Sequence, residues 1–370
     1  MPINTRADKS NRPRRTGDGV RPGGVVDVFC GVGGLSLGFR KTGFSIAGGI
    51  DIDPYCKFAF EKYTGGTFLH TDIAKIDPRR IEAMFGAARP RILVGCAPCR
   101  TFSEYNKKER GKKWNLLPAF AKLVEATEPD MITMENVARL VTYRSGRIFS
   151  KFVDRLASLG YNVTWFVVRA TDYGISQRRK RVVIFGSRRG FIELLPPTHS
   201  EAPTLRSVIG HMPPLRAGTK SASDRYHTAP SLSTKNATRL RHSRPGGTWR
   251  DWPENLRARC HKTRAGAEFG SVYGRLDWDS VGPTVTTQYI KVGTGRFTHP
   301  SQNRALSLRE GALLQTFPPR FQFVDPSEPV LTTRVARLIG NAVPVHLAEV
   351  IAVSMREHIN HHYAGLRGAD

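Results

Sequence analysis

The sequence is short of acidic residues and of long apolar runs. Its 370 residues include 31 Asp and Glu against 57 Lys and Arg, so the formal net charge is +26. A surplus of this size draws polyanions to the surface, which makes nucleic acid the first candidate partner and an anionic membrane surface the second. No run approaches the ~18 apolar residues that a membrane-spanning helix needs, so we expect no segment within a membrane.

Cysteine is also scarce. An odd, sparse set of thiols in a long chain argues against a disulfide framework and indicates a reducing compartment. The five cysteines are Cys30, Cys56, Cys96, Cys99 and Cys260. Residues 1–23 are polar, basic and rich in Pro and Gly, with no apolar stretch behind the charges, so we expect a flexible arm rather than a secretory signal.

Short apolar runs alternate with segments of helical spacing after this arm. The expected strands are residues 25–29, 44–50, 91–95, 130–134, 162–168 and 181–186. Helices are expected over residues 35–41, from Pro54 onward, and over residues 116–126. The alternation predicts an α/β fold with a mostly parallel sheet that is covered on both faces.

The composition changes near Ser187. Residues 188–304 contain 19 Lys and Arg against 8 Asp and Glu, are rich in Pro, Gly, Ser, Thr and His, and show little periodicity. This predicts a second, irregular domain. Helical spacing returns over residues 307–316, 330–339 and 343–358, and the last of these has an apolar stripe that needs a sheet or other helices to cover it.

A glycine-rich turn, Cys30–Gly34, follows the first expected strand and precedes a helix, and Asp51 ends the next strand. Such glycines let the backbone approach a ligand at a helix N-terminus, and the acidic residue can accept hydrogen bonds from a ribose diol. The pattern fits a dinucleotide, S-adenosylmethionine, or a tight turn without a ligand. Ser36 stands where the dinucleotide pattern has its third glycine, which argues against a dinucleotide.

The sequence Cys96-Ala97-Pro98-Cys99 follows the strand at 91–95 and admits several interpretations. It could be a redox pair, half of a zinc site, a loop with Cys99 as a nucleophile, or two inert buried cysteines. The only other Cys–His pair, Cys260-His261, lies at no zinc-site spacing, so we expect no metal. A nucleophile on this loop would lie at the carboxyl edge of the sheet, where α/β enzymes place their sites.

Two further charged motifs adjoin expected strands. Glu135-Asn136-Val137 follows the strand at 130–134, so the carboxylate points into the same crevice as Cys99 or serves as a helix N-terminal charge. The cations of Gln177–Arg181 are either a solvated face or phosphate contacts. Because they abut an apolar strand, we expect Arg181 to point into the crevice.

Taken together and in this order, the motifs resemble those of the DNA (cytosine-5)-methyltransferase family, in its prokaryotic, restriction–modification form. The resemblance runs from Val25 to about Val353. The matching segments are Asp27–Gly34, Ile50–Tyr55, Thr71–Ile73, Pro98-Cys99 with Phe102-Ser103, Glu135–Val137, Gln177–Arg181, Pro283–Thr287, Asn303–Glu310 with Leu314–Pro318, and Ile339–Pro344. Nine collinear motifs at the family's spacings are not a chance match.

The resemblance implies a Rossmann-like domain that binds S-adenosyl-L-methionine at residues 24–187 and a smaller target-recognition domain at 188–304. It implies that helices at 305–360 return to the catalytic domain, and it leaves a tail at 361–370. The implied cofactor-binding residues are Phe29, Gly31, Gly33, Gly34, Asp51, Ile52, Asp72, Ile73, Pro98 and Asn341.

The resemblance also implies covalent catalysis on a cytosine flipped out of duplex DNA. Cys99 would add to carbon 6 of the ring, Glu135 would bond the ring nitrogen and the exocyclic amine, and Arg181, with Arg179 second, would hold the base oxygen. The implied DNA contacts are Arg100, Ser103, Gln177, Thr286 and Thr287. Basic residues between Arg225 and Arg264, interleaved with Tyr226, Trp249 and Trp252, would mostly bind phosphates.

The chain departs from the family at two positions, with Arg100 where the family has Gln and Cys96 where it has Gly. Two alternatives stay open: methyl transfer to RNA by a tRNA-directed branch of the family, and a DNA-binding regulator without catalysis, for which Arg100 is the only support. We expect a monomer in the bacterial cytoplasm, associated with the nucleoid. We also expect a cognate restriction endonuclease that acts on the same site without forming a stable complex.

Overall fold

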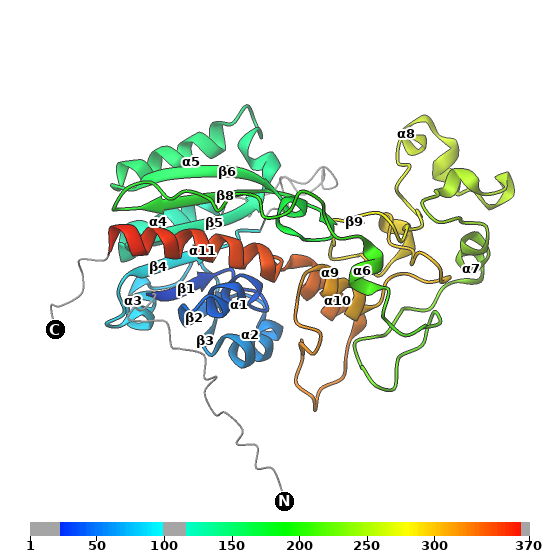
Figure 1. Cartoon of the computed structure of the whole chain (residues 1–370), viewed down its shortest axis with the longest axis horizontal. Helices are drawn as coiled ribbons and strands as arrows, with labels where there is room; N and C mark the ends of the chain where they lie inside the picture. Colours follow the sequence, from blue (N-terminus) through cyan, green and yellow to red (C-terminus); the bar gives the residue numbers. More distant parts are fainter. Residues whose placement is uncertain (1–22, 99–115, 364–370) are drawn as a thin grey trace, which may run out of the picture.

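The computed structural model describes residues 23–98 and 116–363. Its centre is a seven-stranded sheet with the strand order β3-β2-β1-β4-β5-β8-β6 (Figure 1). Neighbouring strands are parallel except at β8, which runs antiparallel to both β5 and β6. The strands are β1 (Gly24–Val28), β2 (Ser45–Asp51), β3 (Thr67–His70), β4 (Arg91–Gly95), β5 (Met131–Val137), β6 (Asn162–Arg169) and β8 (Lys180–Ser187). The predicted α/β fold with a mostly parallel sheet is confirmed.

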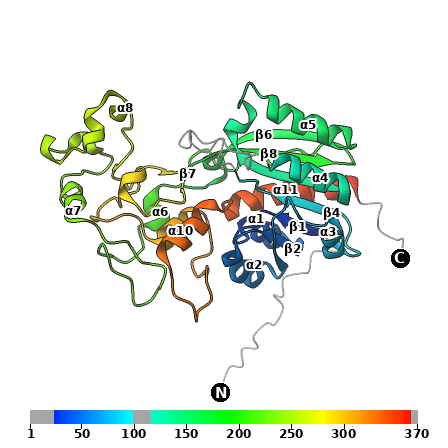
Figure 2. The same ribbon diagram turned by 180° about the vertical axis from the view of Figure 1, so that it is seen from behind.

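Helices cover both faces of this sheet, because successive residues of a buried strand point to opposite sides. In β1, Val25 packs into the core on one side, whereas Val26 and Val28 pack into the core on the other. The first side is covered by α1 (Gly34–Lys41), α2 (Lys57–Thr64) and α11 (Val345–His362), and the second by α3 (Pro78–Phe85), α4 (Leu117–Thr127) and α5 (Arg147–Ser158) (Figures 1 and 2).

The C-terminal helices are part of the core. By length and composition alone, Thr332–His362 would be long and apolar enough to cross a membrane, but 72% of its most apolar window is buried inside the protein. The stretch is divided by Ala342–Pro344 into α10 (Thr332–Asn341) and α11. A Cβ atom on Gly38 of α1 would lie 2.4 Å from the Cβ of Ala348, so glycine is needed for α1 and α11 to lie this close. The apolar stripe of the last helix therefore serves the protein interior.

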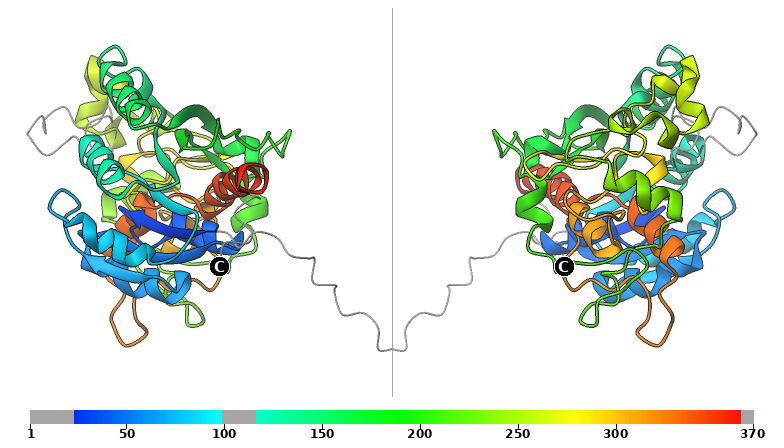
Figure 3. Two further views of the ribbon diagram at one scale, coloured as in Figure 1. Left: turned by 90° about the vertical axis from the view of Figure 1, so that its left-hand side faces the viewer. Right: turned by 90° about the vertical axis from the view of Figure 1, so that its right-hand side faces the viewer.

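The region after β8 is mostly irregular and extends away from the sheet, so that α7 and α8 lie at the opposite end of the molecule (Figures 1 and 2). In the end-on views of Figure 3 this region and the sheet lie one behind the other. Its regular elements include α6 (Leu205–Ile209), α7 (Thr234–Arg241), α8 (Arg264–Ala267), α9 (Leu308–Leu314) and β9 (Gly282–Pro283), which pairs with β7 (Gln177–Arg178) just before β8. Buried Arg275 organises it, because its guanidinium donates to the carbonyls of Leu240, Ser243 and His299. Side-chain hydrogen bonds here replace the ladder of a regular sheet.

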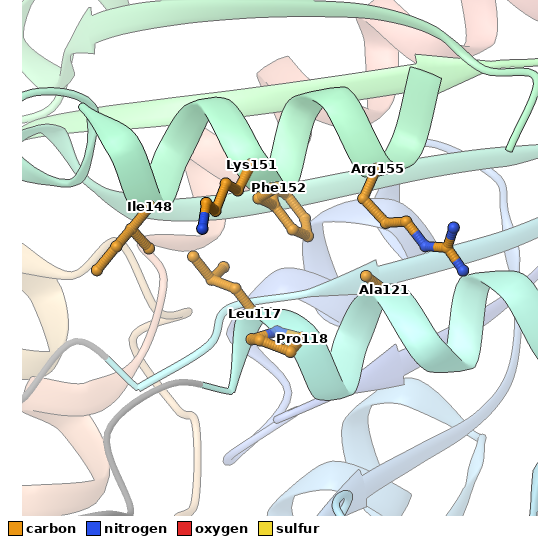
Figure 4. Close-up of a pocket in the computed structure, with 7 residues that line it drawn as sticks. All are labelled: Leu117, Pro118, Ala121, Ile148, Lys151, Phe152 and Arg155. Atoms are coloured by element: carbon orange, nitrogen blue, oxygen red, sulfur yellow. The ribbon is translucent and has the colours of Figure 1, made fainter. Parts of the chain in front are cut away.

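An open hollow of about 210 Å³ lies between α4 and α5 (Figure 4). Its lining is almost entirely apolar, with only Lys151 and Arg155 contributing charged groups. No predicted site residue lines it. Its lining contains no carboxylate, thiol or imidazole.

Candidate active site

The predicted carboxylate lies at the carboxyl end of β5. Glu135 is 1% exposed, and its Oε1 forms an ion pair with Nε of Arg181 at 2.9 Å. Nη2 of Arg179 lies 3.5 Å from the same oxygen. A buried carboxylate is tolerated only where charges and hydrogen bonds compensate its desolvation, and two guanidinium groups do so here. The predicted group of Glu135, Arg179 and Arg181 is therefore brought together.

The antiparallel strand β8 explains how the arginines reach this carboxylate. The register pairs Val137 with Arg181, so Arg181, the second residue of β8, lies diagonally across from Glu135. Arg179 precedes the strand, is 5% exposed, and also donates through Nη2 to the carbonyl of Ala342 at 3.4 Å. Arg179 thus joins the sheet edge to the chain between α10 and α11.

The predicted nucleophile Cys99 lies outside the described residues, as do Arg100 and Ser103. The chain leading to it is described as far as Pro98, whose side chain is exposed. Nδ2 of Asn136 donates to the carbonyl of Ala97 at 3.1 Å, and Oδ1 of Asn136 accepts from the backbone N–H of Val137. Asn136, to which the sequence analysis gave no role, therefore holds the start of the Cys99 loop against β5.

A second contact of Glu135 was also missed. Oε2 accepts from Sγ of Cys96 at 2.9 Å. The parallel register that pairs Gly95 with Met134 brings the next residues of β4 and β5, Cys96 and Glu135, side by side. The strand register predicts that residues 96 and 135 are neighbours, but it does not predict that the thiol faces the carboxylate.

The glycine turn is built around Asp51. Oδ2 of Asp51 accepts from the N–H of Gly31 and Oδ1 from the N–H of Asp53, both at 2.9 Å. Each oxygen keeps a lone pair for a further donor. Burial raises the pKa of this carboxyl above its usual value. Gly31 has a φ of 52°, and a Cβ there would meet nothing within 4 Å, so the space beside the turn is open.

Gly33 and Gly34 of the turn are required by backbone conformation and by close packing, respectively. Gly33 has a φ of 84°, which favours glycine, and Phe29 also has a positive φ of 68°. A Cβ on Gly34 would lie 2.4 Å from the carbonyl oxygen of Val343. Gly34 therefore lets α1 begin against the segment that follows Asn341, whose side chain is exposed.

The remaining predicted cofactor residues differ in accessibility. Ile52 is 66% exposed, whereas Ile73 is 6% exposed and packs in the core with the strands. Asp72 Oδ1 accepts from the N–H of Ala74 at 3.0 Å. Ile52 is thus free to cover a flat ligand, while Ile73 supports the site from beneath.

Two arginines of α10 hold the loop after β2. Nη1 of Arg337 lies 2.7 Å from Oδ2 of Asp53, and the guanidinium of Arg334 lies 3.4 Å from the centroid of the Tyr55 ring. These contacts are an ion pair and a cation–π interaction between elements far apart in the chain. They tie the loop that carries Ile52 to the C-terminal helices.

Comparison with known proteins decides the family. A family model described as C-5 cytosine-specific DNA methylase matches residues 24–357. The chain belongs to this family. It is a DNA (cytosine-5)-methyltransferase, which confirms the predicted family and enzyme class.

The methyltransferase is 48% identical to the Type II methylase M.HgiDII of Herpetosiphon aurantiacus, over 91% of this chain and 96% of that protein. It is 33% identical to the Type II methyltransferase M1.HphI of Haemophilus parahaemolyticus, over 88% of this chain and 85% of that protein.

Two solved structures share its fold. An E. coli protein encoded within a prophage and assigned as a DNA modification methyltransferase has a TM-score of 0.69 at 21% identity, over 91% of this chain and 99% of that one. A Spodoptera frugiperda DNMT2 mutant has a TM-score of 0.62 at 15% identity, over 90% and 99%. At these identities the likeness concerns the fold.

The methyltransferase does not expose every predicted DNA contact. Thr286 is exposed and Thr287 half-buried, but Gln177 is fully buried. The Gln177 amide donates to the carbonyl of Leu314 and to Oε1 of Gln315, and accepts from the N–H of Val285. All three bonds are internal, so Gln177 holds the strand pair β7 and β9 to α9 and presents no group at a surface.

The aromatic residues among the basic cluster of the methyltransferase are likewise internal. Tyr226, Trp249 and Trp252 are 1–4% exposed. Arg239 is 6% exposed, with its guanidinium 5.3 Å from the Trp252 ring centroid. Arg239 therefore directs its charge into an aromatic core, and the prediction that most cations of this cluster bind phosphates concerns its exposed members.

Proposed function

We propose that this enzyme is a Type II methyltransferase that methylates carbon 5 of a cytosine flipped out of duplex DNA, through a covalent adduct with Cys99. The single observation that carries this proposal is the buried Glu135 carboxylate, which pairs with Arg181 at 2.9 Å. Glu135 lies at the carboxyl end of β5, and the adjacent strand β4 leads to Cys99. The 48% identity to a Type II methylase supports duplex DNA over RNA as the substrate.

S-adenosyl-L-methionine fits the described residues as the methyl donor. Asp51 retains acceptor capacity for the ribose hydroxyls, and the space beside Gly31 is open. The exposed Ile52 would cover the adenine, and Asp72 would accept from its amine, with Ile73 beneath. Phe29, Gly33, Gly34, Pro98 and Asn341 complete the proposed pocket. When bound, this cofactor supplies an electrophilic methyl group.

The residues of the chain prepare cytosine carbon 5 to accept that group. The Cys99 thiolate forms a bond to carbon 6, and the electron pair of the 5,6 double bond moves to make carbon 5 nucleophilic. Glu135 bonds the ring nitrogen and the amine, and Arg181, with Arg179 behind it, holds the base oxygen. After methylation, water takes the carbon 5 proton, the double bond reforms and the Cys99 sulfur leaves, so the enzyme is restored.

The target base has to leave the stack, because its carbon atoms are inaccessible inside a duplex. We propose that Arg100, Ser103, Thr286 and Thr287 contact DNA near the flipped base, and that Gln177 acts indirectly by holding residue 285 in place. We retain residues 24–187, 188–304 and 305–360 as the catalytic, recognition and returning segments. The biological setting we propose is protection of host DNA in the cytoplasm by a monomer, paired with an endonuclease that cuts the same site.

A trapping experiment tests the covalent step. Duplex DNA containing 5-fluorocytosine at the recognised cytosine, incubated with the enzyme and cofactor, should give a protein–DNA adduct that survives denaturation. Cys99→Ala should abolish the adduct and keep DNA binding, whereas Cys260→Ala, at an exposed thiol, should leave it intact. An adduct that persists in Cys99→Ala would refute this nucleophile.

A further inference from the structure

We infer that Cys96 is a positioning residue for Glu135, with its S–H donating to the carboxylate that engages the target base. Sγ of Cys96 lies 2.9 Å from Oε2 of Glu135. The inference rests on the proposed function, because it concerns the group that would bind cytosine. It assigns a role to a thiol that the covalent mechanism does not use.

The geometry of the carboxylate makes this contact consequential. Arg181 holds Oε1 at 2.9 Å, and Cys96 holds Oε2 at the same distance, so the two oxygens are fixed by groups from different strands. A carboxylate held through one oxygen can turn about its terminal bond, which has a broad torsional preference. The second donor removes that freedom. Glu135 then presents its remaining lone pairs in one orientation.

Within residues 23–98 and 116–363, the polar side chains nearest to this contact bond to other acceptors. Asn136 is the adjacent polar residue, but its amide donates to the carbonyl of Ala97. Arg179 reaches the same oxygen as Arg181, at 3.5 Å. Gly95, the preceding residue, has no side chain, and a Cβ there would lie 2.7 Å from the carbonyl oxygen of Val28. Position 96 is therefore where the contacts of the described residues place a donor to Oε2.

The chemistry requires a thiol rather than a thiolate at this position. Two anions 2.9 Å apart would repel, whereas an S–H directed at a carboxylate is a charge-assisted hydrogen bond. A thiol is a weak donor, so the contact orients the carboxylate more than it stabilises the fold. A hydroxyl can serve the same purpose, and an aliphatic side chain cannot.

Kinetics on three variants test the role. In single turnover on cognate DNA, Cys96→Ala should lower the methylation rate about fivefold, the scale of one ordinary hydrogen bond, because the thiol is a weak donor, with the KM for cofactor unchanged. Cys96→Ser should recover most of the rate, because the hydroxyl still donates. Cys260→Ser, which removes an exposed thiol, is the matched control. A wild-type rate in Cys96→Ala, or equal losses in the Ala and Ser variants, would overturn the inference.

The reactivity of the Cys96 thiol tests the same contact in a protein that has no catalytic activity. In a Cys99→Ala background, the rate at which iodoacetamide alkylates Cys96, followed by peptide mass spectrometry, should rise severalfold on Glu135→Gln. Glu125→Gln, which alters an exposed pair with Arg155, should have no effect. An unchanged rate in Glu135→Gln would refute the contact. If Cys96 responds as expected while the wild-type enzyme makes no 5-methylcytosine, the contact stands and the proposed function fails.

Discussion

Glu135 and Asp27 are both buried carboxyl groups, and the protein compensates the cost of burying each in a different way. Glu135 is compensated by guanidinium groups, whereas Asp27 accepts from the hydroxyl of Ser36 at 2.6 Å, and its burial raises the pKa of Asp27 to about 7. The guanidinium groups offset the desolvation of the buried Glu135 carboxylate. Burial favours the protonated form of Asp27, which lies beneath the glycine turn.

The proton on Asp27 predicts a stability that depends on pH. The folded protein holds this proton more tightly than the unfolded chain, so its contribution is complete below pH ~4 and is lost as the pH rises to about 7. Between about pH 5.5 and about pH 8 the loss should be about 2 kcal/mol relative to Asp27→Asn, which stays neutral and still accepts from Ser36. Urea denaturation of both proteins at the two pH values measures this difference. A constant difference across that range would contradict a raised pKa for Asp27.

Arg181 should matter for folding as well as for turnover. Arg181→Ala leaves the Glu135 charge buried with one donor fewer, which should lower the free energy of unfolding by about 2–4 kcal/mol and remove most activity. Arg181→Lys should recover stability more than rate, because an ammonium group cannot reproduce the guanidinium geometry. Denaturant titration and single-turnover assays separate the two effects. Full stability in Arg181→Ala would mean that Arg179 alone compensates the carboxylate.

At the scale of elements, α10 links the cofactor site to the rest of the chain. Arg337 pairs with Asp53, and Arg334 covers Tyr55, so the loop after β2 depends on a helix nearly 300 residues further along the chain. On its other side α10 touches the 286–287 segment, where a Cβ on Gly340 would lie 2.4 Å from the carbonyl carbon of Thr286. The helix therefore contacts both the loop that carries Ile52 and the proposed DNA-contacting threonines.

Because of this link, removing the Arg337 side chain should weaken cofactor binding without unfolding the protein. Arg337→Ala should weaken cofactor binding about two- to fivefold, because a partly exposed ion pair that orders the loop is lost. Calorimetry with S-adenosyl-L-methionine measures the change, and Arg356→Ala, which loses only a bond to the Thr42 carbonyl, is the control. Equal affinity in Arg337→Ala and the wild-type enzyme would exclude α10 from cofactor binding.

The strands and helices that could be predicted from the sequence are those with many apolar residues. The six expected strands appear within about three residues of their predicted ends. The central strands β1, β4, β5 and β8 are buried almost throughout, which gives them continuous apolar runs. The edge strand β6 is mostly half-buried or exposed, but it is rich in β-branched and aromatic residues. The strand β3 and the helices α3 and α5 were not predicted. Only one residue of β3 is buried, and α3 buries only Ile81 and Phe85 among its charges. Such weak patterns become elements only through tertiary packing.

The site shows the same division. Glu135, Arg179 and Arg181 could be assigned from motifs, because strand ends determine where they converge. The contact of Cys96 and the internal role of Gln177 could not, because each depends on which way one side chain turns. The family pattern predicts a DNA contact for Gln177, and the structure shows in addition that its amide joins three segments of the chain.

For the whole molecule, the +26 charge predicts how DNA is bound. Residues 188–304 supply a net +11, and part of that charge is internal, as Arg239 and Arg275 show. If the rest engages at least about six phosphates, the logarithm of the binding constant should fall with the logarithm of salt concentration with a slope of about −5 or steeper. Fluorescence anisotropy on labelled duplex DNA across a salt series measures the slope. A slope near −1 would mean that the charge is not directed at the DNA backbone.

This enzyme should methylate carbon 5 of cytosine in duplex DNA. Chromatography and mass spectrometry of nucleosides from DNA exposed to the protein and S-adenosyl-L-methionine measure this product. We expect 5-methylcytosine, absent with Cys99→Ala and present with Cys260→Ala. DNA binding without any 5-methylcytosine, or methylation found only on the cytosine amine or on adenine, would contradict it.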